Sequence, residues 1–345
     1  SAGAGRILPF NPSHDGAPMS ELIDVLLLLA LPASGKSEVR KYLANLSPEK
    51  CREDFLMGPT VQLDDYPYVH LMRTISQELT KLGEDGVFFD SDELPMKQPK
   101  DWGTLIELVN EDFDDLMKKT KVEAKSAGEW MLDRYDNARA KVGAPAAFKP
   151  MPAEIRKRLV DAIEKESSDL LRDKNATIQD TTGKTIVIEF ARGGKDGSSM
   201  PIEPPYGYQH SLSLLSDAIL SRSAICYVWV TPEESRRKNI ERAKPQKAAS
   251  TFLSLNHGVP MAVMMNEYGC DDMAYLLETS GKADSVKVET RGKTFFLPVA
   301  RFDNREDKTT FVRANPSEWK PEDVKALHDG LAAAFQRVAK AKAVS

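Results

Sequence analysis

Cysteine is scarce in this sequence, and no two cysteines are spaced as a pair. Three occur among 345 residues, Cys51, Cys226 and Cys270, and none belongs to a CxxC motif. This argues against a disulfide framework or a zinc site. It is typical of a reducing compartment, so we expect a cytoplasmic protein. The five histidines are scattered without an HExxH pairing, so the sequence gives no support for a metalloprotease.

Long hydrophobic runs and an excess of basic charge are also missing. The apolar run at residues 25–31 is far too short to cross a bilayer, and Glu21 and Asp24 flank it where a signal peptide carries basic residues. We therefore expect a buried parallel strand there, with a signal peptide as the alternative. The net charge of −5 argues against a nucleic-acid groove or an anionic-membrane surface, and it favours a small polyanion as partner.

What is present is an ordinary globular composition with alternating strand and helix patterns at both ends of the chain. Hydrophobic residues make up 41% and charged residues 29%, which is enough to bury a full core. Strands are expected at residues 22–29, 59–66, 185–190 and 224–230, and as a hairpin over 286–304 that turns at 291–292. Helices are expected at residues 38–46, 69–82, 211–223, 231–243, 245–280 and 320–341. The alternation predicts an α/β fold, with a parallel sheet between two helical layers.

A long helical block interrupts this alternation. From about residue 95 to residue 176 the pattern is helical nearly throughout, in three amphipathic segments separated by prolines. We interpret this block as an inserted cap within one domain that spans residues 21–341. Residues 1–20 are rich in Gly, Pro, Ala and Ser and are expected to form a flexible lead-in.

The stretch ALPASGKS, residues 30–37, lies between an apolar strand and an amphipathic helix. It matches the pattern G-x-x-x-x-G-K-[ST] at every fixed position except the first, where Ala30 stands. Such a loop points backbone N–H groups at phosphate oxygens, Gly35 lets the backbone approach, and the following helix adds its dipole. Lys36 would reach the β- and γ-phosphates of ATP, and Ser37 would bind Mg²⁺. The residues predicted to contact the phosphates are Pro32, Ala33, Ser34, Gly35, Lys36, Ser37 and Glu38.

A second GKT occurs in the stretch TTGKT, residues 181–185. It runs into a strand instead of a helix, so it has no helix dipole to offer a phosphate. We predict a β-hairpin turn there and no nucleotide site.

The order of these motifs resembles the P-loop kinases, which phosphorylate nucleosides, nucleotides and small metabolites. The resemblance rests on the 30–37 loop, LDDY after the second strand, IEFARGG after a later one, the arginine-rich helix ESRRKNIERA after AICYVWV, and ARFDN after the last strand. It covers the core of the sheet but not the helical block. It implies a P-loop NTPase core, ATP as co-substrate, Mg²⁺, and an arginine-rich lid over the phosphates. It also implies an adenine pocket bordered by Asn304, with Asp303 and Arg305 beside it.

Carboxylates near the ends of strands are candidates for catalysis and metal binding. Asp64 is our first choice for the general base on the acceptor hydroxyl, and Asp65, which strand alternation points the other way, could hold Mg²⁺ through water. The alternative is that they cap the next helix. Glu189 lies in an apolar run, where an unpaired acid is costly, so it is a candidate for a Mg²⁺-bound water or a substrate hydrogen bond. Arg192 could bind an acceptor phosphate, or form a structural pair with Glu189.

The arginine-rich helix supplies the candidates for neutralising phosphate charge. Arg236 and Arg242 are preferred as catalytic residues because neither has an acid four residues earlier, whereas Arg237 follows Glu233 at that spacing. Arginine suits bidentate contacts with phosphate. The alternative is a helix face that is only solvated.

Together these features predict an enzyme that transfers the γ-phosphate of Mg-ATP in line to a hydroxyl or phosphate of a small molecule. One alternative is a P-loop ATPase or nucleotide-dependent switch without such an acceptor, although no NKxD or LSGGQ motif supports one. A polynucleotide kinase is a second alternative, against which the acidic balance argues. The sequence does not distinguish a toxin-like sugar-nucleotide kinase from this small-molecule phosphotransferase. The acceptor and the oligomeric state stay open.

Overall fold

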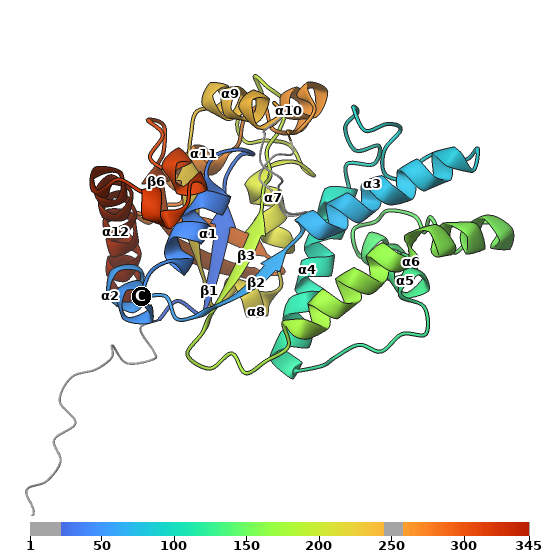
Figure 1. Ribbon diagram of the computed structural model, residues 1–345, viewed down its shortest axis with the longest axis horizontal. Helices are drawn as coiled ribbons and strands as arrows, with labels where there is room; N and C mark the ends of the chain where they lie inside the picture. The colour runs from blue at the N-terminus through green and yellow to red at the C-terminus, as the bar shows by residue number, and fades with distance from the viewer. Residues whose placement is uncertain (1–21, 245–257, 345) are drawn as a thin grey trace, which may run out of the picture.

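Residues 22–244 and 258–344 are described by a computed structural model, whose centre is one six-stranded sheet (Figure 1). The expected lead-in at 1–20 and part of the expected helix at 245–280 lie outside the described residues. The strands are β1 (Val25–Leu29), β2 (Thr60–Asp64), β3 (Thr185–Phe190), β4 (Ser223–Trp229), β5 (Ser285–Thr290) and β6 (Lys293–Asp303). Their order is β2-β3-β1-β4-β6-β5, and only the β5–β6 pair is antiparallel. An α/β fold built on a mostly parallel sheet is thus confirmed.

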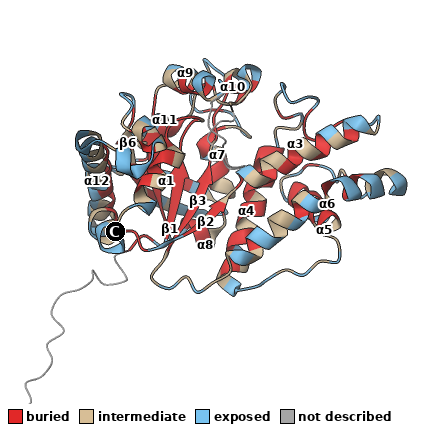
Figure 2. Ribbon diagram, viewed as in Figure 1, coloured by how far each residue is buried: buried red, intermediate tan, exposed pale blue. Residues whose placement is uncertain are grey.

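β1 and β3 are buried along their whole length, which explains why their sequences are continuous apolar runs (Figure 2). β1 pairs with β3 on one side and with β4 on the other, so it has no exposed edge. The register pairs Leu28 with Glu189, which brings the acid of the β3 run close to the strand that enters the 30–37 loop.

The last two strands form the expected hairpin. Arg291 and Gly292 connect β5 to β6 and have φ angles of 51° and 74°. A two-residue loop with two positive φ angles has the twist that fits a β-hairpin. β6 then runs parallel to β4, so its carboxyl end at Asp303 lies at the same edge of the sheet as those of β1 to β4.

Helices cover both faces of the sheet and complete three layers. One face carries α1 (Lys36–Ala44), α2 (Pro48–Phe55) and α12 (Pro321–Val344), and the other carries α4 (Asp101–Lys118), α7 (Gly207–Leu214), α8 (Asp217–Leu220) and α11 (Met273–Thr279). The side chains of β1 alternate between these layers. Leu26 and Leu28 pack in the core of the first face, and Leu27 and Leu29 in that of the second.

The connections that follow β1 and β3 leave the sheet on opposite faces. The chain passes from β1 to β2 through α1 and α2, and from β3 to β4 through α7 and α8. Neighbouring parallel strands with diverging connections leave a crevice at their carboxyl ends, which is where open α/β sheets place their ligand sites. The 30–37 loop lies at this crevice.

The helices between β2 and β3 form a group that extends beside the sheet, and one of them, α4, also packs on the second face of the sheet (Figure 1). They are α3 (Tyr66–Lys81), α4, α5 (Ala127–Lys141) and α6 (Ala153–Ala176). The expected helical block at 95–176 corresponds to α4, α5 and α6, and α3 packs with it. Buried ion pairs join the group, because Asp112 of α4 contacts Arg134 of α5 and Lys174 of α6, each at 2.9 Å. We call these four helices the helical cap.

Two further helices contribute to the carboxyl-end side of the sheet. α9 (Pro232–Arg242) begins where the sequence predicts, with the Thr231 side chain accepting a hydrogen bond from the Glu234 backbone N–H. α10 (Met261–Glu267) follows it, and both lie near the same end of the molecule (Figure 1). No helix among residues 22–244 and 258–344 combines the length and apolar character needed to span a membrane.

Candidate functional site

A cavity of about 590 Å³ opens at the carboxyl ends of β1, β2 and β3. Its floor is the 30–37 loop together with residues that follow β2 and β3. α3 and Trp102 of the helical cap form one wall, and α9 and α10 form another. A smaller cavity of about 270 Å³ lies at the opposite ends of the strands, next to the TTGKT turn. The larger cavity is the candidate site because it combines the predicted loop with the predicted carboxylates.

The 30–37 loop has a backbone shaped for an anion. Ala33 and Gly35 have positive φ angles of 61° and 108°, and α1 starts directly afterwards at Lys36. The backbone N–H groups of residues 33–38 donate no hydrogen bond to any residue that the structure describes. A run of free N–H groups at a helix N-terminus is a general anion-binding feature, and the helix dipole adds to it.

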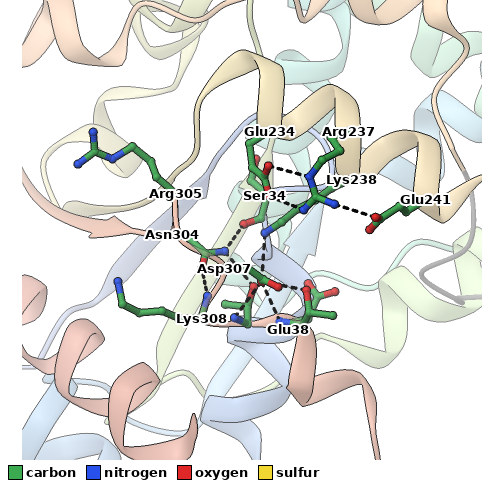
Figure 3. A network of polar contacts seen from close by, with 12 residues as sticks. Ser34, Glu38, Glu234, Arg237, Lys238, Glu241, Asn304, Arg305, Asp307 and Lys308 are labelled. Carbon is green, nitrogen blue, oxygen red and sulfur yellow. Dashed lines mark hydrogen bonds and ion pairs between the residues drawn. The ribbon is translucent and has the colours of Figure 1, made fainter.

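The loop is held in place from outside by side-chain hydrogen bonds to its carbonyl groups. Asn304 donates to the Ser34 carbonyl at 2.8 Å (Figure 3). Ser235 of α9 donates to the Pro32 carbonyl at 2.6 Å. Because these contacts occupy the carbonyl side, the amide side is left for a ligand. Asn304, predicted to border adenine, is fully buried beneath the loop. It supports the loop and is not among the residues that line the cavity, and its place beside adenine stays a prediction.

Gly35 is required by its position as well as by its backbone angle. A Cβ atom on this residue would lie 2.6 Å from Thr309 Oγ1 and 2.9 Å from Asn304 Nδ2. The contacts that hold the loop therefore leave no space for a side chain here.

We predict that Gly35→Ala lowers the affinity for Mg-ATP by about tenfold or more, since a positive φ costs a non-glycine residue about 1–2 kcal/mol and the clash adds to this. Gly281→Ala is the matched control, because Gly281 also has a positive φ (80°) but has no atom near its Cβ position. Isothermal titration of both variants with Mg-ATP checks the prediction. Equal affinities in the two variants would contradict it.

Ala30, which stands at the first glycine position of the pattern, fits the loop without strain. It is not among the described residues with a positive φ. Its side chain is buried in the core with Val39 and Leu28, and its carbonyl accepts a hydrogen bond from Tyr208 Oη at 3.1 Å. This position therefore uses an ordinary backbone conformation that alanine adopts as readily as glycine.

The TTGKT stretch at 181–185 differs from the 30–37 loop, as expected. It is a turn that leads into β3, and no helix follows it. The specific prediction of a β-hairpin turn is wrong, because β3 pairs only with the parallel strands β1 and β2.

Lys36 and Glu189 meet at the crevice between β1 and β3. Their Nζ and Oε1 atoms are 3.9 Å apart, and Arg40 of α1 contacts Glu189 Oε2 at 3.0 Å. Gln62 of β2 also donates a hydrogen bond to this carboxylate. Burial lowers the pKa of Lys36, and the nearby carboxylates of Glu189 and Asp64 oppose this effect. Sequence reasoning missed Arg40, although a residue four positions after Lys36 on a helix lies on the same face.

The neighbouring aspartates at the end of β2 have different surroundings. Asp64 lines the cavity and accepts a hydrogen bond from the Tyr66 backbone N–H at 2.8 Å. Burial, with added repulsion from Glu189 and Asp65, raises the pKa of Asp64 to about 8. A carboxyl group that favours its neutral form is ready to hold a proton.

Asp65 and Arg192 form an ion pair with each other. Arg192 Nη1 lies 2.9 Å from Asp65 Oδ2, and its Nη2 donates to the Trp102 carbonyl at 3.1 Å. Both residues are almost fully buried. The Glu189–Arg192 pair considered from the sequence does not form, and Asp65 is a weaker candidate for Mg²⁺ because Arg192 occupies it.

The two arginines selected on α9 lie in different places. Arg242 lines the cavity, and its Nη2 contacts the buried carboxylate of Glu38 at 3.3 Å. Arg313 contacts the same carboxylate at 2.9 Å. Arg236 is not among the residues that line the cavity, and it donates to the Gly269 carbonyl instead. Of the predicted catalytic pair, only Arg242 therefore lines the cavity.

The donors present suit a magnesium ion that is held mainly by phosphate and water. Within the described part of the chain, no group of three or more His, Cys, Asp or Glu side chains is arranged to hold a metal ion. Ser37, Asp64 and Glu189 all line the cavity, and Glu189 also contacts Lys36. Mg²⁺ often takes only one or two protein ligands when a nucleotide supplies the others, so this donor set fits.

The fold and the site thus define an α/β protein with a cavity at the carboxyl ends of a mostly parallel sheet, lined by apolar side chains and by several charged ones. Searches of family models, of curated proteins and of solved structures found no match to this chain.

Proposed function

We propose that the protein is a Mg-ATP-dependent phosphotransferase that moves the γ-phosphate in line to a hydroxyl or phosphate of a small molecule. The observation that carries this proposal is the grouping around one cavity of the free amides at 33–38, the Lys36 ammonium and the Asp64 carboxyl. The loop would receive the phosphates of ATP, and Asp64 would face the acceptor. Each of these groups is one that phosphoryl transfer uses.

The nucleotide side of the cavity provides three cationic side chains. Lys36, Arg40 and Arg242 line it together with the loop amides. These groups would stabilise the negative charge that spreads over the transferring phosphoryl group. When bound, Mg²⁺ would add charge neutralisation at the β- and γ-phosphates, with Ser37 as the protein ligand best placed for it. Glu189 would hold Lys36 and Arg40 in place.

The acceptor side supports transfer to a small molecule over hydrolysis. In the transfer, the acceptor oxygen forms a bond to the γ-phosphorus while the bond to the β,γ-bridging oxygen breaks and ADP leaves. The hydroxyl proton passes to the Asp64 carboxylate. α3, α10 and Trp102 wall this part of the cavity, which would limit access of water to the γ-phosphate. A simple ATPase needs no such compartment.

Transfer of a labelled phosphate tests the proposal. We expect the protein to move ³²P from γ-labelled ATP to a small molecule in a pooled fraction of metabolites, and Lys36→Ala to lose this transfer. Release of inorganic phosphate alone, unchanged by any fraction, would favour the ATPase alternative and contradict the proposal. Label on the end of an oligonucleotide would instead identify a polynucleotide kinase.

A further inference from the structure

The part of the cavity next to the helical cap contains a buried carboxylate that the phosphotransfer does not use. Glu267 of α10 lines the cavity and is 4% exposed. Its Oε2 accepts a hydrogen bond from the Trp102 indole N–H at 2.7 Å, whereas its Oε1 is buried without a hydrogen-bond partner among the described residues. The Met96 backbone N–H also acts on this carboxylate and opposes the rise of its pKa, but it forms no hydrogen bond to Oε1. A buried oxygen left unpaired costs free energy, so it indicates a site for an incoming donor.

A buried donor accompanies this acceptor. Arg192 also lines the cavity, and its Nε is buried without a hydrogen-bond partner among the described residues. Its guanidinium lies 4.9 Å from the centre of the Trp102 ring, and it acts electrostatically on Glu267. Glu267 thus accepts from the Trp102 indole N–H and Arg192 lies over the Trp102 ring, so an acceptor and a donor lie beside the same residue.

Aromatic side chains wall the space around these two groups. The faces of these rings, where a cation could bind, are already covered by arginine side chains. The Trp102 ring meets Tyr268 edge-on with ring centres 5.8 Å apart. Arg192 covers the Trp102 ring, and Arg73 lies 4.0 Å from the centre of the Phe89 ring. A cationic ligand would meet these guanidiniums at the faces where it would otherwise bind.

We propose that this part of the cavity binds the acceptor through an uncharged, flat, amide-like group, which donates N–H to Glu267 and accepts a hydrogen bond from Arg192. The acceptor hydroxyl would be carried elsewhere on the same molecule, towards Asp64. The inference rests on the proposed function, because that function phosphorylates the acceptor hydroxyl. Binding of the amide-like group does not itself require ATP. An anionic group such as a carboxylate is disfavoured here because it has no N–H to donate to Glu267, whose Oε1 would stay without a partner.

Three small compounds of nearly the same shape test the charge and hydrogen-bonding requirement directly. Benzamide is neutral with a donor and an acceptor, benzoate is an anion and benzamidine is a cation. Titration of the full chain without ATP, followed by saturation-transfer NMR, should show benzamide binding about tenfold or more tightly than the other two. Equal or tighter binding of benzoate or benzamidine would overturn the inference, and so would a failure of all three to bind at millimolar concentration.

A substitution of the carboxylate should reverse the preference. Glu267→Gln keeps the acceptor for Trp102 but turns a donor towards the cavity and removes the negative charge. We expect benzoate to bind this variant more tightly than benzamide does, whereas the exposed control Glu278→Gln keeps the wild-type order. An unchanged order in a folded Glu267→Gln variant would overturn the inference. If that variant does not fold, the order in which the wild-type protein binds the three compounds still tests the inference.

These binding experiments are separate from the test of phosphotransfer. Preferred binding of benzamide by a protein that does not bind Mg-ATP would contradict the proposed function and leave the recognition site standing. Binding of Mg-ATP without a preference for benzamide would overturn only the inference about the acceptor.

Discussion

Replacing Lys36 by alanine is expected to lower the rate of phosphate transfer by about 10²–10³-fold or more, the usual effect of removing one preorganised charge-stabilising group. The affinity for Mg-ATP should also fall, by about 10–100-fold, because a charge-assisted hydrogen bond contributes about 1.5–3 kcal/mol. Transfer of labelled phosphate and isothermal titration measure the two effects. The fold should survive, since Glu189 keeps its contacts with Arg40 and Gln62.

The chain supplies its own control for this substitution. Lys184 belongs to the second GKT, at the turn before β3, and lies outside the larger cavity. Lys184→Ala should leave both the transfer rate and the affinity at wild-type values. Loss of function in Lys184→Ala, or wild-type function in a folded Lys36→Ala, would contradict the assignment of the 30–37 loop.

Asp64→Asn is expected to reduce transfer by about 10²–10⁴-fold while the affinity for Mg-ATP changes by only a few-fold, because an amide cannot take the hydroxyl proton. The asparagine oxygen can still accept the hydrogen bond from the Tyr66 backbone N–H, so the local backbone should be retained. Steady-state rates with saturating ATP test the prediction. A variant that retains full transfer activity would exclude Asp64 as the base.

The pH dependence of stability of the ligand-free protein provides a control for the same substitution. The folded-state pKa of Asp64, raised to about 8 chiefly by burial, exceeds the ordinary value of an aspartate in the unfolded chain. Between these values the folded state holds a proton that the unfolded state has lost, so the free energy of unfolding falls as the pH rises. Asp64→Asn lacks this component. Chemical denaturation should therefore show the variant to be more stable, relative to wild type, at about pH 8 than at about pH 5.

The sequence predicted those elements whose conformation depends on neighbouring residues in the chain. A buried strand, the loop at 30–37 and the helix after it were predicted from the residue pattern, and the structure contains all three. The turn at Arg291 and Gly292 was also predicted from the sequence, and its two positive φ angles fit a β-hairpin. The helical block was recognisable by its periodicity alone, although its packing with α3 was not.

The side-chain partners in the site depend on elements far apart in the chain, so the sequence could not decide them. Asn304 supports the loop because β6 ends beside it, and Arg236 points to Gly269 instead of the cavity. Arg192 pairs with Asp65, which lies more than a hundred residues earlier. Glu267 carried no motif, and only the packing of α10 against Trp102 makes it a candidate. Such pairings depend on the three-dimensional fold, so no pattern of residue spacing in the sequence indicates them.

Hydrogen exchange of the backbone amides, with and without Mg-ATP, tests the central claim most directly. The N–H groups of residues 33–38 have no partner among the described residues, so they should exchange quickly in the free protein. If the 30–37 loop binds the phosphates, Mg-ATP should slow exchange in peptides that cover 33–38 and leave peptides that cover 181–185 unchanged. Unchanged exchange at 33–38, or protection at 181–185 instead, would contradict the account.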